Sequence, residues 1–181
     1  RLLTNYGTDS RVTALVDNVE WFLLPIMNPD GYEQGDRYNA NGSDLNRNWG
    51  GPGAYPAPFS QPETAALRDF LTAHPNLRAH VDFHSAGFMI LWPWGHTPEL
   101  TENHVTFDSL GTEMAERIVE VRGTRYPYRG PIYTTIYPVN GGSIDYSYGE
   151  LGLWSFGFEI GYTFYMPTYE IIPTGEEMFQ S

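Results

Sequence analysis

The hydrophobic residues of this chain follow two alternating patterns, short continuous apolar runs and longer stretches with one apolar face. A continuous run bounded by turn residues is typical of a strand buried on both faces, whereas apolar positions three and four residues apart predict an amphipathic helix. Alternating strands and helices indicate an α/β fold with a mixed, largely parallel sheet flanked by helices. We therefore expect strands at 19–27, 77–83, 88–94 and 153–160, and helices at 10–17, 62–71, 106–121 and 143–151.

Segments rich in turn residues separate these elements. Residues 28–31, Asn-Pro-Asp-Gly, predict a turn after the first strand. Residues 32–61 and 123–140 predict long irregular segments. A loop as long as 32–61 inside a compact domain is usually functional. From Gly161 we expect a loop up to Pro173, where a helix begins and has room for only a few residues. No internal repeat or domain boundary is visible.

The composition excludes several classes of function. The net charge is −12, and such an acidic protein does not offer the basic surface that nucleic acid requires. The chain has no cysteine, which excludes disulfides, thiolate nucleophiles and thiolate metal ligands. No apolar run is long enough to span a membrane. All ten basic residues are arginines, so recognition of an anion would depend on well-placed arginines such as Arg37 and Arg47.

His84 and Glu159 stand at the ends of two predicted strands. Taken alone, a histidine in the position of His84 is more often a hydrogen-bonded core residue than a metal ligand, although ligands gather at strand carboxyl ends in α/β sheets. Glu159 interrupts an apolar run, and a buried carboxylate is costly unless it is paired. From the residues alone, Glu159 has either an arginine partner or a catalytic role.

Five short motifs resemble, in order and spacing, those of the zinc metallocarboxypeptidases of the pancreatic carboxypeptidase A type. The resemblance covers almost the whole chain and implies that residues 1–181 are the central and C-terminal portion of a peptidase catalytic domain. It also implies that the family's His-x-x-Glu zinc motif belongs upstream of Arg1 and that the family's final helix is absent after Ser181. The motifs are Asn-Pro-Asp-Gly at 28–31, Gly-Ser-Asp-Leu-Asn-Arg-Asn-Trp at 42–49, Asp-Phe-His-Ser at 82–85, Tyr-Pro-Val-Asn-Gly-Gly-Ser-Ile-Asp at 137–145 and Phe-Gly-Phe-Glu at 156–159.

The resemblance implies a Zn²⁺ cofactor with His84 as one ligand and two further ligands upstream of Arg1. It makes Glu159 the general base that takes a proton from the attacking water. Asp44 is implied to be the carboxylate that orients the first zinc histidine. Because a catalytic zinc takes three protein ligands, we expect residues 1–181 alone to be inactive.

The resemblance also assigns residues to the substrate. Asn46 and Arg47 would bind the terminal carboxylate, for which the planar guanidinium is suited. Tyr137 would close over the terminal residue. Arg37 would polarise the scissile carbonyl, and its spacing resembles the hormone-processing branch of the family (the carboxypeptidase N and E type) rather than the pancreatic branch. Without the motifs, Arg47 would read as a solvated loop arginine and Tyr137 as a packing residue.

Six positions match the family's pocket for the terminal side chain: Leu91, Gly95, Ile132, Val139, Ile144 and Gly157. Ile144 matches the pocket floor, where an acidic residue marks a preference for terminal Lys or Arg. An apolar floor implies a preference for aromatic or branched aliphatic ends. A basic terminal residue would lack a counter-ion there.

The expected function is zinc-dependent hydrolysis of the C-terminal peptide bond of peptides or proteins, and the resemblance implies a secreted enzyme. Two alternatives remain open. One is a non-catalytic module of the same fold that binds peptide C-termini, which replacement of the upstream zinc motif would favour. The other is a related amidohydrolase that acts on cell-wall peptides, for which a more polar pocket is expected.

Overall fold

The computed structural model describes residues 1–181 and contains a four-stranded open sheet in the order β1-β4-β2-β3. Strand β1 (Ala79–His84) pairs in parallel with β4 (Trp154–Glu159). Strand β2 (Met89–Trp92) is antiparallel to β4 and parallel to β3 (Tyr128–Pro131). The sheet is mixed and largely parallel, which confirms the fold class predicted from the sequence.

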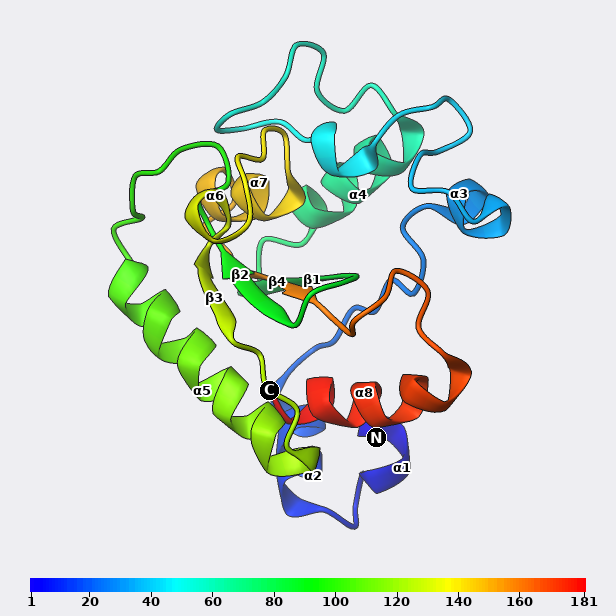
Figure 1. The fold of residues 1–181 in the computed structure, drawn as a ribbon, viewed down its shortest axis with the longest axis vertical. Coiled ribbons are helices and arrows are strands. Elements are labelled where there is room, and N and C mark those ends of the chain that lie inside the picture. Colours follow the sequence, from blue (N-terminus) through cyan, green and yellow to red (C-terminus); the bar gives the residue numbers. More distant parts are fainter.

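Helices lie on both sides of this sheet. In Figure 1, helices α4 and α7 lie above the strands, α8 lies below them, and α5 runs along the left side of the molecule. The helices are α1 (Leu2–Asn5), α2 (Ser10–Asn18), α3 (Pro29–Gln34), α4 (Pro62–Ala73), α5 (His104–Arg122), α6 (Ile132–Thr135), α7 (Ser143–Gly149) and α8 (Thr168–Gln180), with a short 3₁₀ helix at Leu45–Arg47.

The main hydrophobic core lies between α5 and one face of the sheet. Successive side chains of a strand point to opposite faces, so Phe156 and Phe158 of β4 reach this core while Gly157 faces the other way. Phe107, near the start of α5, is fully buried and makes edge contacts with Phe156. The core residues are Ile90, Trp92, Phe107, Ala115, Ile118, Tyr126, Phe156 and Phe158.

Helix α8 is joined to α5 by an ionic cluster around Arg122. Nε of Arg122 lies 2.5 Å from Oε1 of Glu177, and Nη1 lies 2.7 Å from Oε2 of Glu170. The Glu177 side chain is 0% exposed, so its charge is neutralised inside the protein.

The strand predicted at 19–27 is wrong. These residues form no strand, and most apolar side chains of the segment are exposed, with Leu23 76% accessible. Apolar side chains suit a buried strand, but a strand also needs a neighbour to pair with its backbone N–H and C=O groups. No strand of the sheet pairs with this segment, so it forms no strand, although Phe22 packs against Phe70 and His74.

Four segments predicted to be turns or loops contain regular structure, among them 32–61, which includes the end of α3 and the 3₁₀ helix at Leu45–Arg47. Residues 123–140 were expected to be irregular but contain β3 and α6, because β3 pairs with β2 in a long-range register that begins at Met89 and Tyr128. The turn at 28–31 is the start of α3, where the Asn28 side chain accepts from Gly31 N. Helix α8 begins at Thr168, so Pro173 lies inside it rather than at its start.

Candidate active site

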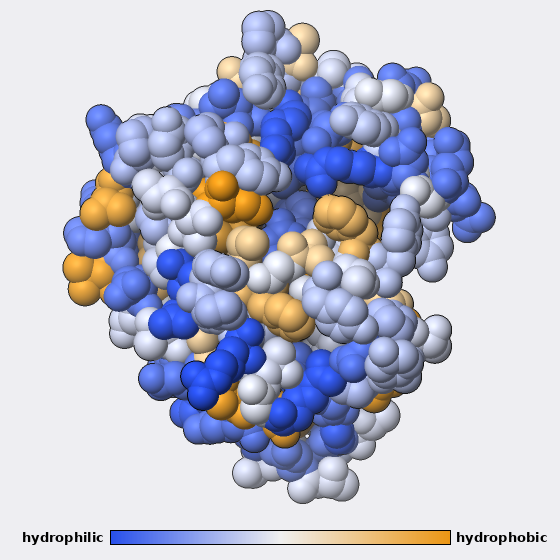
Figure 2. Space-filling view, viewed as in Figure 1, coloured by the Kyte–Doolittle hydropathy of each residue, from blue (hydrophilic) through white to orange (hydrophobic).

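An open cavity lies at the carboxyl ends of β1 and β4. Figure 2 shows this face of the molecule hollowed above the strands, with apolar atoms at the rim. The cavity brings together the residues predicted to be catalytic, metal-binding or substrate-binding, except that Gly95 lies behind Val139 and Ile132 and Asp44 lies beside the cavity, paired with Arg37. The lining residues are Arg37, Asn46, Arg47, His84, Leu91, Ile132, Ile136, Tyr137, Val139, Gly142, Ile144, Asp145, Gly157 and Glu159.

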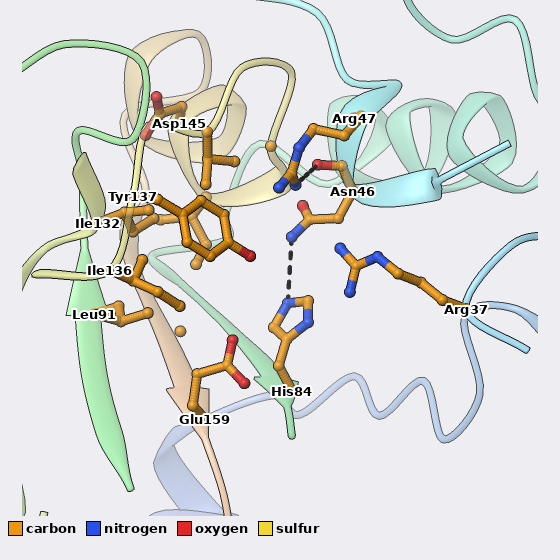
Figure 3. A pocket seen from close by; sticks show the side chains of 14 residues that line it. Arg37, Asn46, Arg47, His84, Leu91, Ile132, Ile136, Tyr137, Asp145 and Glu159 are labelled. Carbon is orange, nitrogen blue, oxygen red and sulfur yellow. Dashed lines mark hydrogen bonds between the residues drawn. The ribbon is translucent and has the colours of Figure 1, made fainter. Parts of the chain in front are cut away.

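The pairing of β1 with β4 places the two chemically most important side chains next to each other. His84 and Glu159 are Cα partners at the last rung of the parallel ladder. Parallel strands end at the same edge of a sheet, so residues distant in the sequence meet where ligands usually bind. Figure 3 shows both side chains at the base of the cavity, with Arg37 and Tyr137 facing them from other segments.

The carboxylate of Glu159 forms neither a hydrogen bond nor an ion pair. Burial raises its pKa, whereas the positive charges of His84 and Arg37 act in the opposite direction. The structure therefore does not support the interpretation of Glu159 as one half of a structural ion pair, because no arginine is paired with it. A raised pKa is typical of a carboxylate that exchanges protons during a reaction.

Only one of the two ring nitrogens of His84, Nε2, contacts other polar groups of the protein. Its Nε2 lies 3.1 Å from Oδ2 of Asp82, and Nδ1 takes part in no hydrogen bond. Burial alone would lower the pKa of His84 and raise that of Asp82, but their mutual attraction outweighs burial, so the pKa of His84 is raised and that of Asp82 is lowered. Nδ1 is the nitrogen left to bind a ligand.

Arg37 reaches the cavity from the long loop that follows α3. Its Nε lies 2.8 Å from Oδ2 of Asp44, and Oδ1 of Asp44 accepts a hydrogen bond of 3.0 Å from the backbone N of Asn46. Burial would lower the pKa of Arg37, but the hydrogen bond and charge of Asp44 raise it, so the guanidinium stays charged. Asp44 therefore ties Arg37 to the turn that carries Asn46 and Arg47.

Arg47 and Tyr137 face each other across the cavity mouth. The guanidinium carbon of Arg47 lies 6.0 Å from the Tyr137 ring centroid, and Nη1 donates to the carbonyl of Asn46 over 2.7 Å. This is the one hydrogen bond of the guanidinium, which has five N–H donors. The remaining donors can bind a carboxylate.

The apolar part of the cavity is a compact cluster. Leu91, Ile132, Val139 and Ile144 are all buried and pack together. Gly157 lies opposite Ile144, where a Cβ atom would approach Ile144 Cδ1 to 2.6 Å. A larger residue than glycine at position 157 would therefore crowd the pocket floor.

The sequence did not single out Asp145, whose carboxylate also lines the cavity. Its side chain is 3% exposed and accepts from the backbone N of Gly95, at 2.8 Å, and from the backbone N and Nδ1 of His96, at 3.0 and 2.8 Å. Burial raises the pKa of Asp145, and these hydrogen bonds act against that shift. Both carboxylate oxygens of Asp145 therefore accept hydrogen bonds from the protein itself, and Asp145 offers no free carboxylate to a bound side chain.

Residues 1–181 do not contain a complete zinc site. No group of three His, Asp or Glu side chains is arranged to hold a metal ion. His84, with its free Nδ1, fits one of the three ligand positions that a catalytic zinc requires. The donor set within this chain is therefore insufficient for zinc by itself.

Known proteins are similar to this chain in sequence and in fold. The whole chain, residues 1–181, matches the family model described as zinc carboxypeptidase. The chain is 33% identical over 210 residues to carboxypeptidase A2 from Mus musculus, an alignment that covers 98% of this chain and 50% of that protein. Carboxypeptidase A1 from Mus musculus is 32% identical over 209 residues, with coverage of 98% and 50%. The chain belongs to the zinc carboxypeptidase family, a family of zinc-dependent proteolytic hydrolases.

Solved structures agree with this assignment. Thrombin-activatable fibrinolysis inhibitor superposes with a TM-score of 0.88 at 25% identity, over 97% of this chain and 52% of that chain. Carboxypeptidase A from Helicoverpa armigera superposes with a TM-score of 0.77 at 27% identity, over 96% and 51%. The chain spans about half the length of the curated relatives it matches. None of its helices has the length and hydrophobicity needed to cross a membrane.

Proposed function

We propose that this chain forms the substrate-binding and proton-transfer part of a secreted metallocarboxypeptidase. The enzyme removes the last residue of peptides and proteins and prefers an apolar or aromatic residue there. The observation that carries this proposal is the shared cavity, in which an imidazole, an unpaired carboxylate, two guanidinium groups and a phenol surround an apolar pocket.

The terminal carboxylate of the substrate is bound by Arg47 and Asn46. The unused donors of Arg47 form two charge-assisted hydrogen bonds to its oxygens, a geometry that the planar guanidinium favours. Tyr137, which is half exposed above Arg47, closes over the bound residue and donates its hydroxyl to the same carboxylate.

Two residues act on the scissile bond. Arg37 donates to the carbonyl oxygen and stabilises the negative charge that develops there. Glu159 accepts a proton from the attacking water and delivers it to the leaving amine, a role that its unpaired carboxylate and raised pKa support. Zinc, when bound, supplies a Lewis acid that polarises the carbonyl and acidifies water.

His84 provides one ligand to this zinc through Nδ1. We infer that the other two ligands come from protein upstream of Arg1, because residues 1–181 contain no further set of suitable side chains. Residues 1–181 alone are therefore expected to bind peptide C-termini without hydrolysing them.

The pocket supports a preference for apolar terminal residues. A Phe or Leu side chain buried against Ile144, Leu91 and Ile132 gains roughly 1.5–3 kcal/mol. A terminal Lys or Arg side chain would find no free anion within the apolar pocket, because the carboxylate of Asp145 is hydrogen-bonded to Gly95 and His96 and the carboxylate of Glu159 lies at the scissile-bond side of the cavity.

Peptidase assays test this proposal. The protein that includes the upstream ligands, loaded with zinc, should cleave acylated dipeptides ending in Phe or Leu faster than those ending in Lys, and residues 1–181 alone should not cleave them. Glu159→Gln should lower kcat by about 10²–10⁴-fold with little change in KM. Glu99→Gln, which alters an exposed side chain, is the matched control and should leave kcat unchanged. Full activity of Glu159→Gln, or faster release of lysine than phenylalanine, would contradict the proposal.

A further inference from the structure

Strand β1 carries its polar side chains on the covered face and its apolar side chains on the exposed face. His80, Asp82 and His84 are partly buried, whereas Val81 and Phe83 between them are exposed. The period of two along a strand puts the three polar side chains on one side, facing α7. Such a row of polar residues under a helix costs desolvation, so each member needs a partner.

Asp82 is the centre of this row. Its Oδ2 accepts a hydrogen bond of 2.5 Å from Ser143 Oγ and lies 3.1 Å from Nε2 of His84. Ser143 is the first residue of α7, and its backbone N donates to Oδ1 of Asn46 over 3.0 Å. The Asn46 amide nitrogen lies 3.5 Å from His84 Nε2, which closes a ring of four residues: Asp82, His84, Asn46 and Ser143.

This ring determines which nitrogen of His84 carries the proton. Oδ1 of Asn46 is occupied by Ser143, so its amide nitrogen, which can only donate, faces Nε2. The carboxylate of Asp82 can only accept, and it lies closer to Nε2. The shorter, charge-assisted contact with Asp82 is the stronger one, so Nε2 is protonated and Nδ1 keeps a free lone pair.

We propose that Asp82 is a positioning residue of the active site: it selects the His84 tautomer that exposes Nδ1 and, through Ser143, fixes the start of α7 beside Ile144. The relevance of Nδ1 to catalysis rests on the proposed function, in which that nitrogen binds the metal. The ring also includes Asn46, so one carboxylate connects the metal-binding side of the cavity with its substrate-binding side.

The first test measures the His84 tautomer by nitrogen-15 NMR of residues 1–181, without metal, at an alkaline pH at which the imidazole is neutral. The wild type should be protonated at Nε2. Asp82→Ala removes the acceptor and leaves the Asn46 amide as the nearest partner of Nε2, so the tautomer ratio should shift towards Nδ1–H by about tenfold. Asp82→Asn, whose amide oxygen can still accept, should restore part of the wild-type ratio.

Two serine variants separate the two halves of the proposal. Ser143→Ala keeps the Asp82–His84 contact, so the tautomer should stay as in the wild type while the affinity for N-acetyl-phenylalanine falls several-fold. Ser147→Ala removes the neighbouring hydrogen bond to His80 on the same helix and should change neither quantity. Thermal unfolding of every variant shows whether it is folded.

The outcomes distinguish this proposal from the proposed function. A wild-type His84 protonated at Nδ1, or an unchanged tautomer ratio in a folded Asp82→Ala, overturns the role of Asp82. If Asp82→Ala does not fold, the wild-type tautomer still decides the matter. Failure of the zinc-loaded protein to cleave any peptide, with the tautomer shift as expected, overturns the proposed function and leaves the role of Asp82 in place.

Discussion

The two faces of the sheet differ although they are made by the same strands. Along β4, Phe156 and Phe158 are buried under α5, whereas Gly157 and Glu159 line the cavity on the opposite face. The face under α5 is closed over β2 and β4 by aromatic packing and by the ionic cluster that attaches α8, whereas Val81 and Phe83 of the edge strand β1 stay exposed on that face. The cavity face keeps an unpaired carboxylate, a free imidazole nitrogen and unused guanidinium donors.

This difference separates stability from function. On the closed face, polar groups such as Arg122 and Glu177 satisfy one another, so substitutions there should change the free energy of unfolding. On the cavity face, unsatisfied groups are available to a substrate, so substitutions there should change binding or turnover more than stability. Three substitutions test this separation.

The largest expected effect is that of Arg122→Ala on the closed face. The substitution leaves the charge of Glu177, which is fully buried, without its cation, and we expect a loss of about 3 kcal/mol of stability. Urea unfolding of residues 1–181 measures this loss as a lower midpoint at an unchanged slope.

Arg117→Ala is the matched control on the same helix. Its side chain is 53% exposed and pairs with Glu113 and Glu120 at the surface, over 3.5 and 3.4 Å. Exposed pairs of this kind contribute about 1 kcal/mol or less. Equal losses for the two variants would show that the ionic cluster does not hold α8 to the closed face.

Ile144→Asp should have the next largest effect, on specificity. An acidic pocket floor removes the apolar contact of a terminal Phe and should weaken its binding by roughly 1.5–3 kcal/mol, or about 10- to 150-fold. The affinities of N-acetyl-phenylalanine and N-acetyl-lysine for residues 1–181, measured by calorimetry, should then reverse in order. Unchanged selectivity in a folded variant would exclude Ile144 as the pocket floor.

The sequence predicted the cavity face better than the periphery. The apolar runs at 77–83 and 153–160 predicted β1 and β4, and the prediction is right because these two strands pair with each other in the fold. The motifs at the ends of the two runs identified His84 and Glu159. The run at 19–27 has the same composition but no neighbouring strand, and β3 forms despite its turn residues because β2 pairs with it. Pairing partners are a property of the whole fold, which a local pattern does not contain.

Two acidic residues, Asp145 in the cavity and Asp82 beside it, were overlooked for different reasons. Asp82 precedes His84 by two positions, so the strand period alone places both on one face, and this signal was present in the sequence. The partners of Asp145, in contrast, are the backbone of Gly95 and the ring of His96, which only the folded chain brings near. Only the structure therefore shows whether a buried carboxylate is free or already hydrogen-bonded.

The smallest expected effect is that of Tyr126→Phe, again on the closed face. The hydroxyl of Tyr126 is buried and has no hydrogen-bond partner, a situation that costs about 1–3 kcal/mol. Removing this oxygen should raise the stability by about 1 kcal/mol at neutral pH, as measured by urea unfolding. Tyr128→Phe, which alters an exposed hydroxyl two residues further on, should change it by less than about 0.5 kcal/mol.

The benefit of Tyr126→Phe should grow in alkali. Burial, and then the negative charge of Glu177, raise the pKa of Tyr126 above its usual value of 10.0, whereas Arg122 acts in the opposite direction. As the pH of a wild-type solution rises, the Tyr126 phenol therefore ionises in the unfolded chain before it ionises in the folded protein. The stability that the neutral phenol contributes is complete below pH 10 and is lost as the pH rises through the raised pKa of the folded state. Tyr126→Phe lacks this one proton, so its advantage should increase above pH 10 by at most about 1.4 kcal/mol per pH unit. A constant difference between the two proteins from pH 8 to pH 12 would mean that water reaches the Tyr126 hydroxyl and that the closed face is less tightly sealed than its packing implies.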